Sequence, residues 1–252
     1  MSAPAILLDA DIVCYQIAAA AEEPIDWGDG LWTLHAWEEP AIAKLEDYIE
    51  TLRQDLGGGE VIACLSDSSN FRKDVLPTYK ANRKATRKPL LLSLLRRYTA
   101  ETYRSYQRPG LEGDDLLGIL ATSSVIKGEK VMVTIDKDLK CIPGKHLNMG
   151  KRDEGVYEVT EEQADYWHLF QTLTGDQTDG YAGCPGIGPK KAEAVLADAS
   201  TPAEMWQRIV KVYEKAQLSE AEALVQARVA RILRSADYDF KAKSVKLWLP
   251  PV

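Results

Sequence analysis

Three short apolar runs, each ending at an aspartate, constrain the fold of this chain more than any other feature. The runs cover residues 5–8, 61–65 and 131–135, and they lead to Asp9, to Asp67, and to Asp136 with Asp138. Stretches of helical length separate the runs; from Ala41 to Leu56, apolar residues recur every three or four positions. Short strands that alternate with helices predict an α/β fold with a mostly parallel central sheet and flanking helices.

The second part of the chain has a purely helical pattern. Capping boxes, in which a Ser or Thr precedes a Glu or Gln by three residues, occur at 160–163, 201–204 and 219–222. The first starts a predicted helix to Leu173, and everything beyond Gly188 is predicted to be helical, with a last helix to about Ser235. We therefore predict an α/β core over residues 1–160 and a helical module over 161–252.

Two segments have less regular patterns. Residues 140–159 are polar and hairpin-like, and the Trp-rich residues 24–40 are predicted as a loop or a small hairpin without an assigned role. The four cysteines are far apart and form no CxxC pair, so the sequence indicates neither a zinc knuckle nor a disulfide framework. No apolar run approaches the roughly 20 residues that span a bilayer, and no leader pattern is seen. We expect reduced core thiols and a cytoplasmic protein.

Nine carboxylates follow predicted strands or begin predicted helices. They are Asp9, Asp67, Glu112, Asp114, Asp115, Asp136, Asp138, Asp176 and Asp179. Taken singly, an aspartate after a strand is usually a turn residue or a helix cap. Taken together, carboxylates at the ligand-binding edge of an open parallel sheet would repel one another. Hard divalent cations relieve that repulsion, so the pattern predicts two Mg²⁺ ions, with Mn²⁺ as an alternative.

The positive charge of the chain is concentrated in one segment, although the net charge is −7. Residues 72–108 contain eleven Lys and Arg against two acids, which gives +11 − 2 = +9. Such a local field attracts a polyanion. Five aromatic residues are interleaved with these cations, which favours pairing with a nucleic-acid backbone and stacking on its bases: Phe71, Tyr79, Tyr98, Tyr103 and Tyr106.

A glycine turn precedes the helical residues after Gly188. In Gly186-Ile187-Gly188-Pro189-Lys190-Lys191, glycines allow close approach of a ligand, and Pro189 suits the first helical position. Free N–H groups and the two lysines at the positive end of the helix predict a phosphate grip. The alternative is an ordinary surface helix start with solvated lysines.

Five motifs resemble, in order and spacing, those of the 5′-nuclease superfamily. They are LLDAD, FRKDVLPTYKANRK, LEGDDLLGILA, VTIDKDL and LTGDQTDGYAGCPGIGPKKA, and the resemblance covers roughly residues 5–200. That superfamily includes the 5′→3′ exonuclease domains of bacterial DNA polymerase I and the flap endonucleases. The chain looks closest to phage 5′→3′ exonucleases of the T-seven gene-six type. The resemblance implies a PIN-like nuclease core and a C-terminal helix–three-turn–helix module that binds duplex DNA.

The resemblance also implies roles for individual residues. The nine carboxylates match the metal-binding acids of the family, with Asp9, Asp67, Asp114 and Asp136 assigned to catalysis, while Asp11 is an additional acid beside the first motif. Lys80 and Arg83 match a catalytic basic pair in a gateway over the scissile phosphate, within a basic segment at 71–108. Further DNA contacts are implied for Arg72, Lys84, Gly186, Gly188, Lys190 and Lys191. Carbonyl oxygens of the glycine turn are implied to hold a K⁺ ion.

We therefore expect a metal-dependent 5′→3′ exonuclease or flap endonuclease. The expected substrate is duplex DNA with 5′ ends or flaps, and an RNA–DNA hybrid is a further candidate. We expect a phage-encoded monomer in the host cytoplasm, acting in replication, primer removal or recombination, with no membrane partner. Two alternatives remain: a DNA-structure-binding protein of the same fold that does not cut, and a PIN-type ribonuclease, which the duplex-binding module disfavours.

Overall fold

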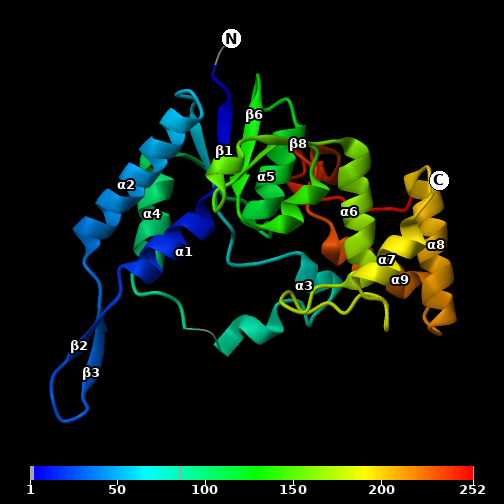
Figure 1. Cartoon of the computed structure of the whole chain (residues 1–252), viewed down its shortest axis with the longest axis horizontal. Coiled ribbons are helices and arrows are strands. Elements are labelled where there is room, and N and C mark those ends of the chain that lie inside the picture. The colour runs from blue at the N-terminus through cyan, green and yellow to red at the C-terminus, as the bar shows by residue number, and fades with distance from the viewer. Residues whose placement is uncertain (1–2, 86, 252) are drawn as a thin grey trace.

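A six-stranded sheet forms the centre of the computed structural model, which describes residues 3–85 and 87–251, without the side chains of Lys84 and Ala85. The strand order is β5-β4-β1-β6-β7-β8. The strands are β1 (Ala5–Asp9), β4 (Val61–Cys64), β5 (Arg104–Tyr106), β6 (Lys130–Thr134), β7 (Gly144–Asn148) and β8 (Tyr157–Val159). Neighbouring strands are parallel except that β8 runs antiparallel to β7. The predicted α/β fold with a mostly parallel sheet is confirmed (Figure 1).

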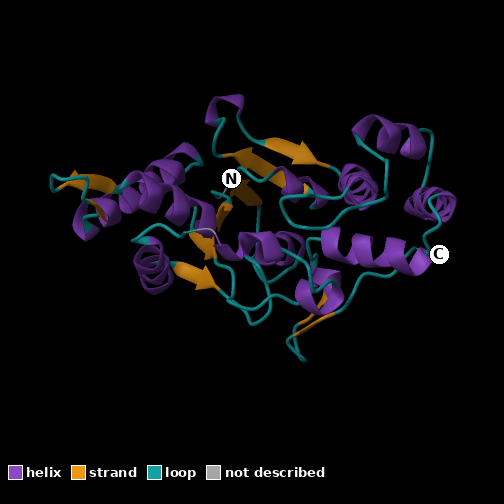
Figure 2. Cartoon of the chain, turned by 90° about the horizontal axis from the view of Figure 1, so that it is seen from below, coloured by secondary structure: helices purple, strands orange, loops and turns teal. Residues whose placement is uncertain are grey.

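Helices cover both faces of this sheet (Figure 2). One face carries α1 (Ala10–Ala20), α2 (Glu38–Asp55) and α4 (Leu92–Thr102), and the other carries α5 (Gly113–Thr122). Successive side chains of a strand point to opposite faces, so Ile6 and Leu8 of β1 pack on the first face while Leu7 packs on the second. Because both faces are buried, the central strands are apolar throughout.

Short helices connect these elements. They are α3 (Arg72–Val75) and the 3-10 helices η1 (Ala81–Ala85), η2 (Lys137–Cys141), η3 (Arg152–Glu154) and η4 (Ser235–Asp237). The hairpin-like region at 140–159 forms β7 and β8, which pair with each other and extend the sheet beyond β6.

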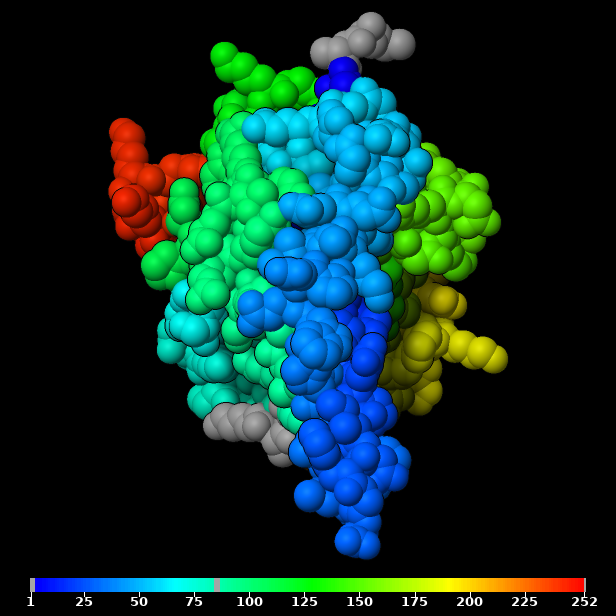
Figure 3. Space-filling model, turned by 90° about the vertical axis from the view of Figure 1, so that its left-hand side faces the viewer, coloured from blue at the N-terminus to red at the C-terminus, as the bar shows by residue number. Residues whose placement is uncertain are grey.

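The Trp-rich region forms a hairpin that projects from the body of the molecule. Strands β2 (Glu23–Asp26) and β3 (Trp32–His35) pair with each other and with no other strand of the described chain. Figure 3 shows the hairpin as the blue extension at the lower end of the molecule. Trp27 is 64% exposed and Trp32 is 59% exposed, so neither side chain packs in a hydrophobic core.

The helical module consists of α6 (Glu161–Thr174), α7 (Pro189–Leu196), α8 (Pro202–Lys215) and α9 (Glu220–Ala230). Leu173, Ile209 and Tyr213 lie in its own apolar core. The predicted capping residues are confirmed, because the hydroxyls of Thr160, Thr201 and Ser219 each accept a hydrogen bond from the backbone N–H three residues later.

The end of the chain differs from the prediction. Helix α9 ends at Ala230, not near Ser235, and the following residues include the short strands β9 (Tyr238–Asp239) and β10 (Ser244–Val245). Ile232 and Leu233 pack into the apolar cluster under α5. The predicted division at residue 160 is therefore not a clean boundary, because the chain returns to the α/β core after α9.

The four cysteines are free and buried, as expected. Within the described part of the chain, no helix is long and apolar enough to cross a bilayer.

Candidate active site

Neighbouring strand ends bring two predicted acids together. Asp9 is the last residue of β1. Asp136 is the second residue after the adjacent strand β6. Asp9 is only 3% exposed, and its Oδ2 accepts a hydrogen bond from the Thr134 hydroxyl at 2.8 Å. Burial, with added repulsion from Asp11 and Asp136, raises the pKa of Asp9 to about 7. A carboxyl group in this state lacks a compensating cation.

The first turn of α5 supplies a third acid to the same place. Burial raises the pKa of Asp114 well above its usual range, and among charged groups Asp9 and Asp136 add most to the shift. Glu112, the N-cap of α5, behaves differently. Burial favours its neutral form, but Arg72 and Lys80 outweigh that effect and hold its pKa at about 2.

Helix η2 places two acids of one motif side by side. The Asp136 carboxylate caps η2 by accepting the Asp138 N–H at 2.8 Å. Burial raises the pKa of Asp138 to about 7, and Asp136 and Asp176 add to the shift. The Asp138 Oδ1 atom is buried and has no hydrogen-bond partner within the described residues. A buried carboxylate oxygen without a donor is costly, so this atom is available to a cation.

The loop after α6 carries the last two acids of the prediction. Asp176 Oδ1 accepts the N–H groups of Thr178 and Asp179, which fixes a tight turn. Asp179 faces the α/β core, because its Oδ2 lies 3.4 Å from Lys80 Nζ. The helical module therefore contributes negative charge to the same site as the acids at the strand ends.

Five of these acids line one small cavity of about 20 Å³, which is room for roughly one water molecule, while Asp9 and Asp176 lie outside its lining. Its charged lining consists of Glu112, Asp114, Asp136, Asp138, Asp179 and Arg72. The lining comes from elements that lie far apart in the sequence.

Lys80 is held by contacts to Glu112 and Asp179, two of the acids that line this cavity. Its Nζ lies 2.6 Å from Glu112 Oε1, and its backbone N–H donates to the Asp179 carbonyl at 2.8 Å. The residue has φ of 53°, a left-handed conformation that costs a non-glycine residue about 1 kcal/mol or more. Gly180 makes the close contact possible, since a Cβ there would lie 3.0 Å from the Thr78 carbonyl oxygen. Backbone strain at Lys80 is consistent with a functional role for its ammonium group beside Glu112.

Arg83 also pairs with the acids, through its guanidinium and Asp179 Oδ1 at 2.5 Å. Its side chain is about half exposed at 49%, so it borders solvent as well as the carboxylate. The structure thus places both predicted gateway cations beside the acid cluster.

Tyr79 belongs to the site, in a role that differs from the one its sequence position predicts. It was predicted to stack on bases, yet it is 3% exposed, and its hydroxyl lies 2.9 Å from Glu112 Oε2 and 3.0 Å from Asp179 Oδ2. Burial raises the pKa of Tyr79, so the phenol keeps its proton and donates to one of the two carboxylates at a time. None of the other four predicted stacking aromatics is fully exposed. The only signal in the sequence was the adjacency of Tyr79 to Lys80.

The prediction that Arg72 contacts DNA is wrong. Arg72 is 2% exposed, and its guanidinium forms a bidentate pair with Asp115 at 2.7 and 2.8 Å. It also donates to the backbone carbonyls of Val229 and Arg231. These bonds satisfy the guanidinium inside the protein, so Arg72 joins the first half of the chain to the segment at and beyond the end of α9.

The prediction that Asp115 binds metal is also wrong. Asp115 is 0% exposed, and both of its oxygens accept from Arg72. The backbone N–H groups of Glu112 and Leu233 donate to the same carboxylate. With four donors, this group has no lone pair directed to the cavity.

Asp67 and Asp11 lie outside the cavity lining. Hydrogen bonds from Ser69 and from the Gly110 N–H hold Asp67 in its own loop and lower its pKa to about 2. Asp11 pairs with Arg96 at 2.7 Å and accepts the Ser66 N–H. The expectation that Asp67 joins the other acids is therefore not met in this structure.

The acids have the chemistry of a divalent cation site, although their arrangement is not that of a loaded one. Among the described residues, no three Asp, Glu, His or Cys side chains are already grouped as an ion requires. Lys80 and Arg83 pair with Glu112 and Asp179 instead. Asp138 has an unpartnered oxygen, and burial with added repulsion from Asp136 and Asp176 raises its pKa, so these cations do not compensate it. The residues present therefore fit hard divalent ions.

The glycine turn is open to solvent, as the predicted phosphate grip requires. Gly188 is the N-cap of α7 and Pro189 its first residue, while Gly186 has φ of 74° and space beside its Cα. Lys190 and Lys191 are exposed, and Lys191 Nζ donates to the Gly186 carbonyl at 2.8 Å. Contact of these residues with DNA stays a prediction, and the predicted contact of Lys84 falls on a side chain outside the described residues.

Several cations of the basic segment are paired within the protein. Arg87 pairs with Glu22, Arg96 with Asp11, and Arg104 with Glu60. The field of this segment is therefore weaker than its count of +9 suggests.

Comparison with known proteins gives consistent matches. The family model described as "5'-3' exonuclease, N-terminal resolvase-like domain" matches residues 4–167. The exodeoxyribonuclease of Enterobacteria phage T3 is 32% identical over 97% of this chain and 92% of its own length. The exonuclease of Escherichia phage T7 is also 32% identical, over 97% of this chain and 93% of its own length.

Solved structures share the fold. A flap endonuclease of bacteriophage T5, in a complex with DNA and metal ions, superposes with a TM-score of 0.67 at 14% identity. The match covers 90% of this chain and 88% of that chain. The catalytic core of Rad2 in a complex with a DNA substrate superposes with a TM-score of 0.53 at 15% identity, over 86% of this chain and 68% of that chain.

Proposed function

The chain belongs to the 5′-3′ exonuclease family and shares its activity, and from this premise we propose a metal-dependent nuclease that acts on duplex DNA at 5′ ends or flaps. The observation that carries the proposal is the acid cluster at the carboxyl edge of the sheet, with its unpartnered Asp138 oxygen. The T3 relative is named an exodeoxyribonuclease, and the T5 structure holds DNA and metal ions, which supports this substrate and this cofactor class.

We assign the two divalent ions to two groups of neighbouring carboxylates, one around Asp114 and one around Asp138. Burial raises the pKa of Asp114, with added repulsion from Asp9 and Asp136, and burial raises the pKa of Asp138, with added repulsion from Asp136 and Asp176. We propose Mg²⁺ for both, with Mn²⁺ as a substitute. When bound, two such ions would lower the pKa of a coordinated water and balance charge on the reacting phosphate.

The side chains of the protein orient the phosphate. Lys80 and Arg83 now pair with Glu112 and Asp179, carboxylates that a divalent ion would also attract. If those carboxylates held the ions, both cations would be available to bind phosphate oxygens and to stabilise the charge that grows there. Tyr79, between Glu112 and Asp179, keeps the acids of the two modules in register.

The duplex would continue over the helical module. Gly186, Gly188, Lys190 and Lys191 present an exposed helix N-terminus and two ammonium groups, which suit phosphate oxygens. We include the K⁺ ion of the glycine turn in the proposal, and a monomer in the host cytoplasm as its setting.

The test is digestion of a 5′-labelled duplex, a 5′ flap and an RNA–DNA hybrid with Mg²⁺, with Mn²⁺ and with EDTA. We expect cleavage from the 5′ end in either ion and none in EDTA. DNA binding without cleavage in both ions would favour the non-cutting alternative. A single-stranded RNA is digested in parallel, and cleavage of that RNA alone would favour the PIN-type ribonuclease.

A further inference from the structure

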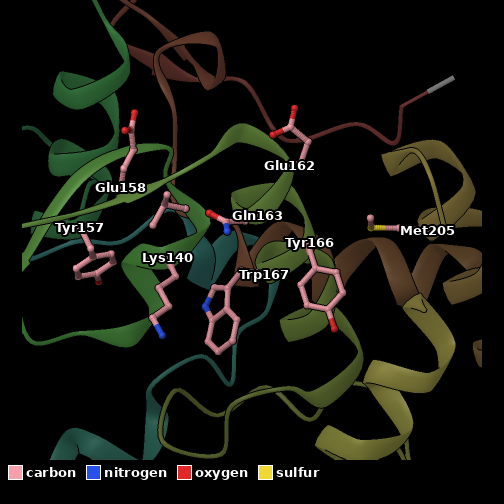
Figure 4. A pocket seen from close by; sticks show the side chains of 9 residues that line it. Lys140, Tyr157, Glu158, Glu162, Gln163, Tyr166, Trp167 and Met205 are labelled. Carbon is pink, nitrogen blue, oxygen red and sulfur yellow. The ribbon is translucent and has the colours of Figure 1, made fainter. Parts of the chain in front are cut away.

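A groove separate from the acid cavity lies between β8, η2 and α6. It has a volume of about 540 Å³, within the range of small-molecule sites. Its lining is Lys140, Tyr157, Glu158, Val159, Glu162, Gln163, Tyr166, Trp167 and Met205, of which all but Val159 are labelled in Figure 4.

Three aromatic rings form part of the walls of the groove: those of Tyr157, Tyr166 and Trp167. Figure 4 shows Lys140, Trp167 and Tyr166 side by side, and the Lys140 ammonium lies 5.4 Å from the centre of the Trp167 ring. Trp167 and Tyr166 both stack on Phe170, at 5.4 and 6.1 Å, which fixes their orientation. Tyr157, on the opposite wall, is 40% exposed. Fixed rings of this kind favour a planar ligand that stacks.

The groove also contains polar groups that the protein does not use. The Trp167 indole nitrogen is buried and has no hydrogen-bond partner among the residues that the structure describes. The Gln163 carbonyl accepts from the Thr160 N–H, which leaves its amide group for a ligand. An apolar side chain in the groove would leave the indole N–H unsatisfied, at a cost, whereas a heterocycle with acceptor atoms would satisfy it.

The charge at the rim indicates which part of a nucleotide would enter. Lys140 contributes +1 and Glu158 and Glu162 contribute −2, so the rim is +1 − 2 = −1. An anionic phosphate group is not favoured inside such a rim. A neutral base is, because its ring acceptors suit the indole and amide donors while its amino groups suit the glutamates.

The groove is connected to the acid cavity through shared elements. Helix η2 carries both Asp138 of the cavity and Lys140 of the groove, two residues apart. Helix α6 carries Tyr166 and Trp167 and then leads directly to the loop of Asp176. A polynucleotide at the cavity could therefore present a nearby unpaired base to the groove.

We propose that this groove is a subsite for an unpaired nucleobase of the substrate. The proposal rests on the proposed nuclease function, which provides the polynucleotide. The base stacks on Tyr166 and accepts a hydrogen bond from the Trp167 indole N–H, while its phosphates stay outside the glutamate rim.

The test compares two single-stranded probes of equal length in Ca²⁺, oligodeoxythymidylate and an abasic backbone. Because base–aromatic stacking stabilises binding, we expect the wild type to bind oligodeoxythymidylate about 10-fold more tightly than the abasic backbone. We expect Tyr166→Leu and Lys140→Ala each to lower this ratio several-fold, and Tyr166→Phe, which keeps the ring, to preserve it. Trp32→Leu in the projecting hairpin is the matched control and should leave the ratio unchanged.

Photo-crosslinking with 5-iododeoxyuridine in the same probe locates the base. Cross-links within residues 157–167 are the expected result. Unchanged ratios in Tyr166→Leu and in Lys140→Ala, with cross-links only in other segments, would overturn the subsite and favour a protein partner for the groove. Cleavage of the 5′-labelled duplex is measured on the same preparations, so that loss of nuclease activity is distinguished from loss of base binding.

Discussion

Two neighbouring groups of buried charge in this molecule differ in one respect, which is whether each charge has a partner. Asp115 is fully enclosed and receives four hydrogen bonds, two of them from Arg72. Asp114, one residue earlier, faces Asp9 and Asp136, and burial among those acids raises its pKa. The first carboxylate completes the fold, and the second leaves a charge imbalance that a ligand must correct. Buried carboxylates therefore divide into structural and functional groups by their partners, not by their positions in the sequence.

The largest effect expected from this difference is on stability. Arg72→Met leaves the Asp115 charge buried and unpaired, which should lower the free energy of unfolding by about 3–5 kcal/mol. In contrast, Asp136→Asn with Asp138→Asn removes repulsion and should cost less than about 1 kcal/mol. Urea denaturation of the metal-free proteins measures both. A loss below about 1 kcal/mol for Arg72→Met would contradict the structural role of the pair.

The same double change should have the opposite effect on activity. Asp136→Asn with Asp138→Asn should lower the cleavage rate at least 100-fold, about 2.7 kcal/mol in activation free energy. Binding of duplex DNA should be kept or become tighter, because two anionic groups near the phosphate are removed. Single-turnover cleavage in Mg²⁺ and binding in Ca²⁺ test this. Residual cleavage above one per cent of the wild-type rate would contradict the assignment of these ligands.

Lys80 tests whether a cation paired with the acids acts in catalysis. Its Nζ lies 2.6 Å from Glu112, so Lys80→Ala should lower the single-turnover rate about 100-fold with little loss of affinity. Arg97, exposed in the same basic segment, is the matched control, and Arg97→Ala should affect affinity more than rate. Equal small losses of affinity in both variants, with unchanged rates, would contradict the gateway role of Lys80.

Much of the fold follows from local sequence patterns. The central strands β1, β4 and β6 are continuous apolar runs, and the helices of the second module begin at capping boxes. Strand β5 escaped prediction because its three residues, Arg104–Tyr106, are too short and too polar to form such a pattern at a sheet edge. The end of α9 escaped prediction because Ile232 and Leu233 continue an apolar pattern but pack under α5. Tertiary packing overrides the local pattern at both places.

The site could be predicted only in part for a similar reason. The nine acids that follow strands or begin helices are visible in the sequence, and five of the nine line one cavity. The partners that separate Asp115 from Asp114 are not visible, since Arg72 lies 43 residues away from Asp115 and Leu233 lies 118 residues away. The role of Tyr79 depends in the same way on Glu112 and on Asp179, which lies 100 residues further along the chain. Long-range pairing decides the function of each acid.

The smallest expected effect is on the salt dependence of DNA binding, and it concerns two lysines that face solvent. Lys190 and Lys191 are exposed at the start of α7, a position that suits contact with a phosphate group. If both contact phosphate, replacing them with Ala should reduce the slope of log affinity against log salt by roughly 0.9 for each contact. The matched control replaces Lys211 and Lys215, two exposed lysines of α8, and changes the net charge equally. Binding of one duplex across a salt series in Ca²⁺ separates the two cases, because a general field effect would alter both variants alike, whereas direct contact alters only the first. Equal slopes in the two variants would mean that the lysines of the glycine turn are solvated surface charges, and that the module holds DNA by other groups.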